Sequence, residues 1–306
     1  MISFRQHVVT IVAVFLALAL GMLAGSAFIQ PRLVETLETR VDEQLGMIAD
    51  LRDEVGGLQD RLAAEQAFND VALPHLTEGR LLGLDVVVIA QEGVEDEVIA
   101  GTRQALEEAG AAVVVLSARD ELAPQDPDEQ AALAELLELP GADPLDLSRL
   151  AAEALADRLA SDDRRSEPEG SGLLHGLLSE GYLAPVDANI SDATLDTIGG
   201  PDQMVVVLGG GGTVEPVMAP EDFAVPLVER LAELGLAVAA GESVGTVVPF
   251  VPLLRAGGVD GLVTVDDLDE SRGGAALVLG LERLLQTGQG GEYGVKGDAA
   301  PLPPLP

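Results

Sequence analysis

The chain has 306 residues, of which 52 are acidic and 17 basic, so its formal net charge is −35. Such a charge repels nucleic acid and anionic lipid surfaces, and we expect no nucleic-acid partner. The absence of cysteine excludes disulfides, cysteine zinc sites and thiol chemistry.

The first predicted element is a membrane-spanning helix. Residues 8–29 carry no charge, and at about 1.5 Å per residue a helix of this length reaches about 33 Å, enough to cross the hydrocarbon core of a bilayer. A cleaved signal peptide is the competing interpretation, because Gly25, Ser26 and Ala27 resemble a cleavage site. The apolar run is longer than a signal core, so we assign residues 1–30 to a leader and a transmembrane anchor.

Small residues recur every four positions along this span, at 13, 17, 21 and 25. Gly21 and Gly25 form a G-x-x-x-G pair, which lets two helix backbones approach closely. We predict that this pair lies in a dimer interface. The alternative is that small residues are simply common in membrane helices.

A heptad pattern follows, and residues 31–72 are predicted to form a parallel two-stranded coiled coil. β-Branched residues dominate the a positions and leucine the d positions, a combination that favours two parallel strands. Gln44 and Glu65 are polar exceptions at d. A higher oligomer, a partner helix docked at Leu45 and Met47, and a single helix folded against its own domain remain alternatives. The predicted interface residues of this homodimer are Val34, Leu37, Val41, Ile48, Leu51, Val55, Leu58 and Leu62.

From residue 81 onward, short apolar runs alternate with amphipathic helices. The runs at 84–90, 111–116 and 204–208 are continuous, as in strands buried on both faces of a parallel sheet, and those at 236–240 and 261–265 are weaker examples. Helices are expected at 94–109 and 223–234. Residues 73–286 are therefore predicted to form an open, mostly parallel, Rossmann-like α/β domain of about five strands, with a helical insert at about 128–180.

The last residues, 287–306, are rich in glycine and end in P-L-P-P-L-P. This composition predicts a disordered tail, and a polyproline II ligand is the alternative. Lys296 lies in this tail. It is the only lysine beside 16 arginines, which we interpret as a coding bias and not as a functional signal.

Two glycine-containing motifs resemble catalytic or phosphate-binding sequences. Residues 241–245 read G-x-S-x-G, the nucleophile elbow of α/β hydrolases, but that pattern needs a histidine later in the chain. His7, His75 and His175 all precede it. The four glycines at 209–212 match neither the dinucleotide fingerprint nor the P-loop. We expect plain turns at both places and a protein that is not an enzyme.

Acidic residues just after the last predicted strand form a candidate metal site. Asp266, Asp267 and Asp269 lie at the edge where open α/β sheets bind ligands, and magnesium or calcium would suit their oxygens. Their spacing does not match a calcium loop, and acids before a helix also serve as caps. Copper(I) needs thiolates or thioethers, but the chain offers only five scattered methionines. No cofactor is evident.

Five segments carry a family resemblance. They are the opening I-S-F-R-Q-H-V-V-T-I-V-A-V-F-L-A-L-A-L-G, G-R-L-L-G at 79–83, L-E-E-A-G-A-A-V at 106–113, and T-V-D-D-L-D at 264–269 with G-E-Y-G at 291–294. Together they resemble the actinobacterial copper-transporter family over nearly the whole chain. The resemblance implies a cell-envelope protein with a role in copper efflux or homeostasis, in a family proposed to form an outer-membrane channel. Copper is implied by this resemblance alone.

Two functions of different classes therefore stand side by side. One is the copper role that the resemblance implies, although a single span makes no pore and no soft ligands are present. The other is a dimeric, non-catalytic scaffold whose anchored rod presents the domain to a cell-wall or cell-division protein of the envelope. We expect a cytoplasmic amino terminus and an extracytoplasmic bulk, although the flanking charges, Arg5 against Arg32 and Arg40, indicate orientation only weakly.

Overall fold

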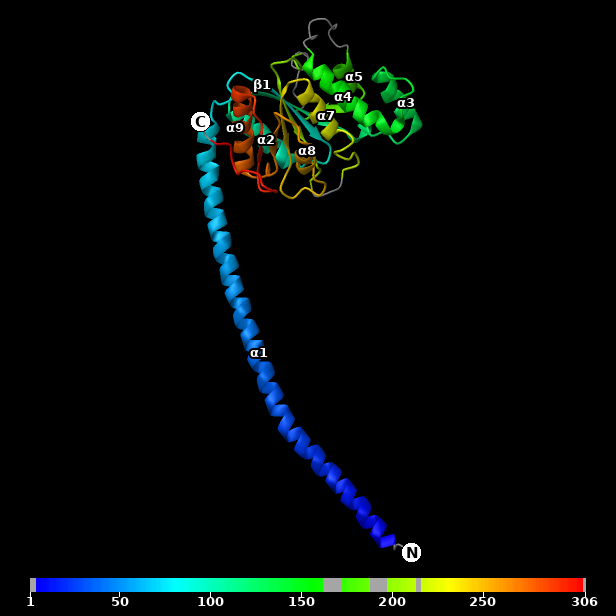
Figure 1. Ribbon diagram of the computed structural model, residues 1–306, viewed down its shortest axis with the longest axis vertical. Helices are drawn as coiled ribbons and strands as arrows, with labels where there is room; N and C mark the ends of the chain where they lie inside the picture. The colour runs from blue at the N-terminus through cyan, green and yellow to red at the C-terminus, as the bar shows by residue number, and fades with distance from the viewer. Residues whose placement is uncertain (1–3, 162–171, 188–196, 213–215, 305–306) are drawn as a thin grey trace. The chain divides into compact units, whose positions relative to one another are not determined.

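The computed structural model of the protein (Figure 1) describes residues 4–161, 172–187, 197–212 and 216–304, without the side chains of 26–39. The chain divides into two compact units, Met1–Glu65 and Gln66–Pro306. The first unit is helical, and the second is a mixed α/β domain.

Helix α1 (Phe4–Thr77) runs without interruption through the predicted span and the heptad segment. Its part Phe4–Gly25 has a mean hydropathy of 2.6 and is long and apolar enough to cross a membrane, by length and composition. Of the predicted dimer residues, Val34 and Leu37 lie among the side chains outside the description. The other coil positions are exposed, so the coiled coil stays a prediction.

A seven-stranded sheet forms the centre of the second unit, with the order β3-β2-β1-β4-β5-β6-β7. All neighbouring strands are parallel except the β2–β3 pair. The five predicted strands are all present: β1 (Asp85–Gln91), β2 (Ala112–Ala118), β4 (Met204–Leu208), β5 (Ala237–Gly241) and β6 (Val263–Val265). The expected number of about five was too low, because β3 (Leu183–Pro185) and β7 (Gly291–Tyr293) extend the two edges.

Side chains that alternate along the central strands fill two apolar layers. Val87 and Ile89 of β1 belong to one cluster, whereas Val86 and Val88 belong to the other, because successive residues of a strand point to opposite faces. Helices α2 (Asp96–Glu108) and α9 (Ser271–Thr287) cover the second face. The first face is covered by α3 (Pro127–Leu136), α4 (Leu147–Ala160), α5 (Leu173–Ser179), α7 (Ala224–Glu233) and α8 (Val251–Gly257).

The predicted helical insert contributes directly to the first layer. Helices α3, α4 and α5 supply buried leucines and alanines to the same cluster as β1 and β4, and the 3-10 turn η1 (Asp120–Leu122) before them adds Leu122, whereas the turn η2 (Pro144–Asp146) adds no buried residue. Figure 1 shows α4 beside α7. The described part of the insert thus shares one core with the sheet.

The carboxyl-terminal residues differ from the predicted disordered tail. Strand β7 pairs in parallel with β6, and Tyr293 forms a further bridge with Ala300. Leu302 packs against the second apolar cluster. Only three residues form β7, so main-chain hydrogen bonds and buried charges hold it in place, and neither leaves a periodic apolar pattern in the sequence.

Candidate functional site

Polar side chains gather at the carboxyl edge of the sheet, beyond β5 and β6. Three carboxylates there, those of Glu242, Asp266 and Asp267, are completely buried. A buried carboxylate is costly unless it is paired and hydrogen-bonded. Each of the three faces a basic side chain, so this edge of the sheet is built around ion pairs.

Glu242 follows β5 directly and binds three groups. Its Oε1 lies 2.7 Å from Nζ of Lys296, and its Oε2 accepts main-chain N–H bonds from Phe250 at 2.6 Å and Val251 at 3.0 Å. Lys296 Nζ also donates to the carbonyl of Ser243 at 3.1 Å. The chain's only lysine therefore links the carboxyl-terminal residues to the loop that follows β5. The sequence interpretation missed this contact.

Asp266 follows β6 and makes a similar set of contacts. Its Oδ2 lies 2.5 Å from Nη1 of Arg255, and its Oδ1 accepts N–H bonds from Val295 at 2.7 Å and Lys296 at 3.0 Å. Gly294 has φ +126°, and an added Cβ there would lie 2.3 Å from Asp266 Oδ1. Only glycine therefore fits this close approach of the tail.

Asp267 is the least satisfied of the three carboxylates. Its Oδ2 accepts from Nη2 and Nε of Arg272 at 2.9 and 3.1 Å, but its buried Oδ1 has no hydrogen-bond partner among the described residues. Burial raises the pKa of the Asp267 carboxyl above its ordinary value, against the hydrogen bond and charge of Arg272. Arg272 compensates only part of the cost of burying this charge.

The predicted metal ligands are thus neighbours with different partners. Asp266 and Asp267 each face their own arginine, and Asp269 is exposed and accepts the N–H of Val244 at 2.8 Å. Among the described residues, no three His, Asp or Glu side chains are grouped as metal ligands would be. In this arrangement the three aspartates hold loops and a helix terminus in place.

The two glycine motifs also lie at this edge and contact each other. The N–H of Gly209 donates to the carbonyl of Gly241 at 3.2 Å, and that of Gly212 donates to Gly93 at 2.7 Å. An added Cβ at Gly210 would lie 3.2 Å from Oε2 of Glu242. The polar groups around these glycines include main-chain carbonyls, the Thr246 hydroxyl and the carboxylates of Glu242 and Glu95, and carboxylates do not suit a phosphate. Ser243 is buried on the loop after β5, whereas the chain's histidines lie in α1 and α5.

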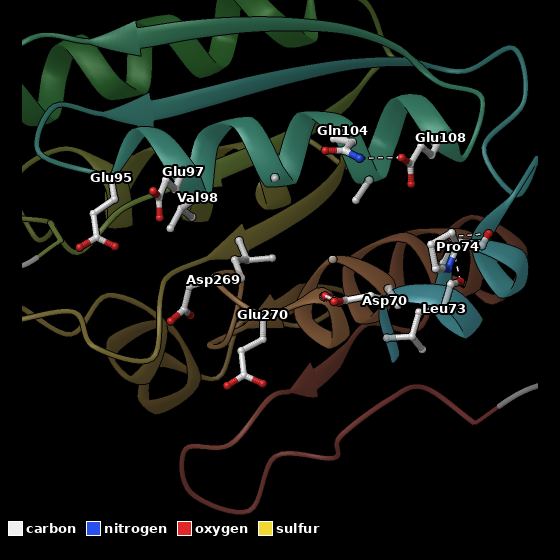
Figure 2. Close-up of a pocket in the computed structure, with 17 residues that line it drawn as sticks. Asp70, Leu73, Pro74, Glu95, Glu97, Val98, Gln104, Glu108, Asp269 and Glu270 are labelled. Carbon is white, nitrogen blue, oxygen red and sulfur yellow. Dashed lines mark hydrogen bonds between the residues drawn. The ribbon is translucent and has the colours of Figure 1, made fainter. Parts of the chain in front are cut away.

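An acidic cavity of about 440 Å³ lies beside this edge, between the last turns of α1, α2 and the start of α9. Figure 2 shows the carboxylates around it, and none of its lining residues is basic. Its acidic residues are Asp70, Glu95, Glu97, Glu108, Asp269 and Glu270. Such oxygens suit hard cations or a basic side chain better than copper(I).

The methionine sulfur atoms of the described residues gather neither at the carboxyl edge of the sheet nor around the acidic cavity. Met204 and Met218 are fully buried in the domain, whereas Met22 and Met47 are exposed on α1. A soft metal ion would need several sulfur ligands together. Within the described residues, the domain therefore offers hard oxygen ligands at its surface and keeps its sulfur in the core.

Comparison with known proteins gives a consistent result over the whole length. Residues 1–304 match the family model described as "Copper transport outer membrane protein, MctB". Proteins named "Copper transporter MctB" from Mycobacterium tuberculosis (strain ATCC 25618 / H37Rv) and Mycobacterium bovis (strain ATCC BAA-935 / AF2122/97) are each 27% identical, and the match covers 96% of both chains. The Mycobacterium leprae (strain TN) protein of the same name is 26% identical over the same shares.

Proposed function

The chain belongs to the MctB family of copper transport outer membrane proteins, and from this premise we propose that it is a single-pass protein of the cell envelope that acts in copper efflux. The observation that carries the proposal is the family match over residues 1–304, which includes both α1 and the α/β domain. The relatives named as copper transporters match this chain over 96% of their own length.

The amino-terminal helix supports a membrane anchor. Phe4–Gly25 is apolar and none of it is buried inside the protein, so a bilayer is the environment that would cover it. We place the amino terminus in the cytoplasm and the acidic domain outside. The family name points to the envelope.

The α/β domain supports an indirect role in copper movement. Its strand order matches the doubly wound arrangement, and we propose a Rossmann-like fold whose crevice between β1 and β4 is occupied by its own loops. The Gly212–Gly93 hydrogen bond joins the loops that follow these two strands. We propose no catalytic reaction for this edge, and copper is treated as cargo that other envelope components carry.

A scaffold for envelope machinery is the second candidate function. The observation that favours it is the exposed apolar stripe of α1 at positions 41–62, which is typical of a surface that binds another helix. In this alternative, the rod presents the acidic domain to a cell-wall or cell-division protein. Copper resistance would then be unrelated to the domain.

Copper accumulation separates these two functions. Host cells that lack the gene should accumulate more copper and grow less well in copper than cells that carry the full chain. A reporter fused after Pro306 should be active only outside the cytoplasm. Unchanged copper content would overturn the efflux role, whereas a reporter active only in the cytoplasm would overturn the orientation and leave the copper result standing.

A further inference from the structure

The heptad segment of α1 carries an apolar surface that its own unit leaves uncovered. We propose that residues 41–62 of two copies of this chain form a parallel, in-register, two-stranded coiled coil in which Gln44 faces its counterpart. The parallel orientation rests on the proposed anchor, because two spans that enter one bilayer from the same side make their rods parallel. The register rests on the heptad residues alone.

The exposure of the seam gives the first argument. Its six apolar residues keep between 44% and 56% of their surface exposed, although they recur with heptad spacing on one stripe of the helix. A helix in water depends on the packing of such a stripe for most of its stability. The stripe extends over about 32 Å, or three heptads, which is sufficient for a coiled coil. The seam consists of Val41, Ile48, Leu51, Val55, Leu58 and Leu62.

The residue types at the seam determine the number of strands. Val41, Ile48 and Val55 occupy a positions, and Leu51 and Leu58 occupy d positions. In a parallel dimer, the side chains at a and d meet the partner at different angles, and β-branched residues at a with leucine at d pack best in two strands. In a parallel, in-register pair, the second copy of this chain presents the same residue types at the same positions along the coil.

The charges beside the seam favour a parallel pair. In a parallel coil each g residue faces the e residue of the partner's next heptad. In register, this places Arg40 opposite Leu45, and no g–e pair along residues 40–66 joins like charges, whereas Glu65, the d residue that follows the seam, would face its own copy. The remaining facing pairs are Met47 with Arg52, Glu54 with Gln59, and Arg61 with Gln66.

Two antiparallel registers would bring like charges together. If Val41 faced Leu58 of an antiparallel copy, the g residues Arg40 and Arg61 would lie opposite each other at both ends. A shift by one heptad that pairs Ile48 with Leu58 would place Arg52 opposite its own copy, whereas the opposite shift, which pairs Val41 with Leu51, would place Arg40 opposite Glu54 and is excluded by the anchor alone. Like charges directly across a helix pair destabilise it, so the first two antiparallel registers are disfavoured.

Gln44 sets the register of the parallel pair. It is the polar d residue within the apolar seam, and in register its amide can hydrogen-bond to the same amide of the second copy. A slip of one heptad would bury it against a leucine and leave the amide without a partner. Single polar residues in a seam fix register in this way, at a cost in stability.

The small residues of the span do not continue this seam. Gly21 lies 27 residues before Ile48, about seven and a half turns of an ideal α-helix, and therefore on the opposite side. An added Cβ at Gly21 or Gly25 would meet nothing within 4 Å in a single chain. We therefore assign the second copy to the coil on the evidence of the coil alone, and the glycine pair stays a separate prediction.

Cysteine cross-linking of the full chain in membranes tests the proposal, because the natural sequence has no cysteine. Leu51→Cys and Leu58→Cys place a thiol at d, whereas Asp53→Cys and Asp60→Cys place it on the outer face as matched controls. With diamide as a copper-free oxidant, most of each d variant should migrate as a disulfide dimer, against less than about a tenth of each control. Gly21→Leu with Gly25→Leu should leave this result unchanged.

Each other outcome would overturn a defined part of the proposal. Equal cross-linking of the outer-face variants, or none at either d position, would remove the coiled coil. In a mixture, one chain would carry only Val41→Cys and a differently tagged chain only Leu58→Cys. A disulfide between these two chains would show an antiparallel pair. Loss of cross-linking in the glycine variant would assign the dimer to the span. The carboxyl-terminal reporter described above shows separately whether the proposed anchor has failed.

Discussion

Lys296 and Glu242 lie 54 positions apart in the chain, and their charged groups meet at 2.7 Å. The carboxylate is completely buried, whereas the lysine keeps 26% of its side chain exposed. The lysine therefore lies between the buried carboxylate and the solvent. Through this ion pair, the carboxyl-terminal residues cover the edge of the sheet beyond β5. Three of the predictions below concern this edge.

Replacement of Lys296 by methionine should lower the free energy of unfolding by about 3 kcal/mol, because Glu242 would keep its buried charge without its only basic partner among the described residues. Urea unfolding of the full chain in detergent can be followed by tyrosine emission, since both tyrosines lie in the domain and the chain has no tryptophan. Lys296→Met with Glu242→Gln should recover part of the loss.

Arg149→Met is the matched control for this prediction. The Arg149 side chain is 43% exposed and pairs with the partly exposed Asp146 and Glu153 near the start of α4, so its loss should cost far less stability than the loss of Lys296. An equal loss in both variants would show that Lys296 contributes no more than an exposed arginine.

The stability of the domain should depend on Asp267 in the acid range. Burial raises the pKa of this carboxyl in the folded state, so between its ordinary value of 3.8 and the raised value the folded state binds more protons than the unfolded state. This contribution to stability is therefore fully present below about pH 4 and is lost as the pH rises through the folded pKa. Asp267→Asn removes this titration.

Urea midpoints of the natural chain and of Asp267→Asn, measured between pH 4 and pH 7, provide the test. The natural chain should gain stability relative to the variant as the pH falls through this range. A relative loss toward acid would mean that Arg272 dominates and that the pKa of Asp267 is lowered.

Gly273→Ala should destabilise the domain by about 3 kcal/mol. An added Cβ would lie 2.0 Å from the carbonyl oxygen of Asp267, and main-chain atoms cannot move aside cheaply. Gly101→Ala in α2 is the control, because nothing lies within 4 Å of its added Cβ. Alanine is the better helix former, so this control should gain about 0.5–1 kcal/mol. Similar urea midpoints for the two variants would contradict the close contact at Gly273.

Val41→Asp with Ile48→Asp should convert the proposed dimer of the full chain into a monomer in detergent. Two charged side chains at a positions would have to be buried in the seam without partners. Ala49→Asp with Ala63→Asp adds the same charge at b positions and should leave the dimer intact. Light scattering measures both masses, and a dimer that survives the seam substitutions would place the interface elsewhere.

The fold could be predicted where the sequence carries a local pattern. Residues 204–208 are apolar throughout because β4 is buried on both faces, and the predicted strand has the observed bounds. Helix α2 was predicted for the same kind of reason, from Val98, Ile99 and Leu106 on one face. Periodicity of this kind reports which face of an element is buried.

The edge of the sheet could not be predicted in this way. Strand β7 has only three residues, and it is held by main-chain bonds and by Asp266. Lys296 was interpreted as a coding bias because its partner, Glu242, is remote in sequence. The aspartates were recognised as a cluster at the correct edge, but Arg255 and Arg272, which pair with two of them, carry no motif that links them to a carboxylate.

The closure of the sheet by its last strand also determines when the domain can finish folding. Glu242 and Asp266 are made before Val295 and Lys296, so both carboxylates lack these partners until almost the whole chain has left the ribosome. For a protein whose bulk we place outside the cytoplasm, we expect this edge of the domain to gain its stabilising contacts only after residues 295 and 296 have also been exported.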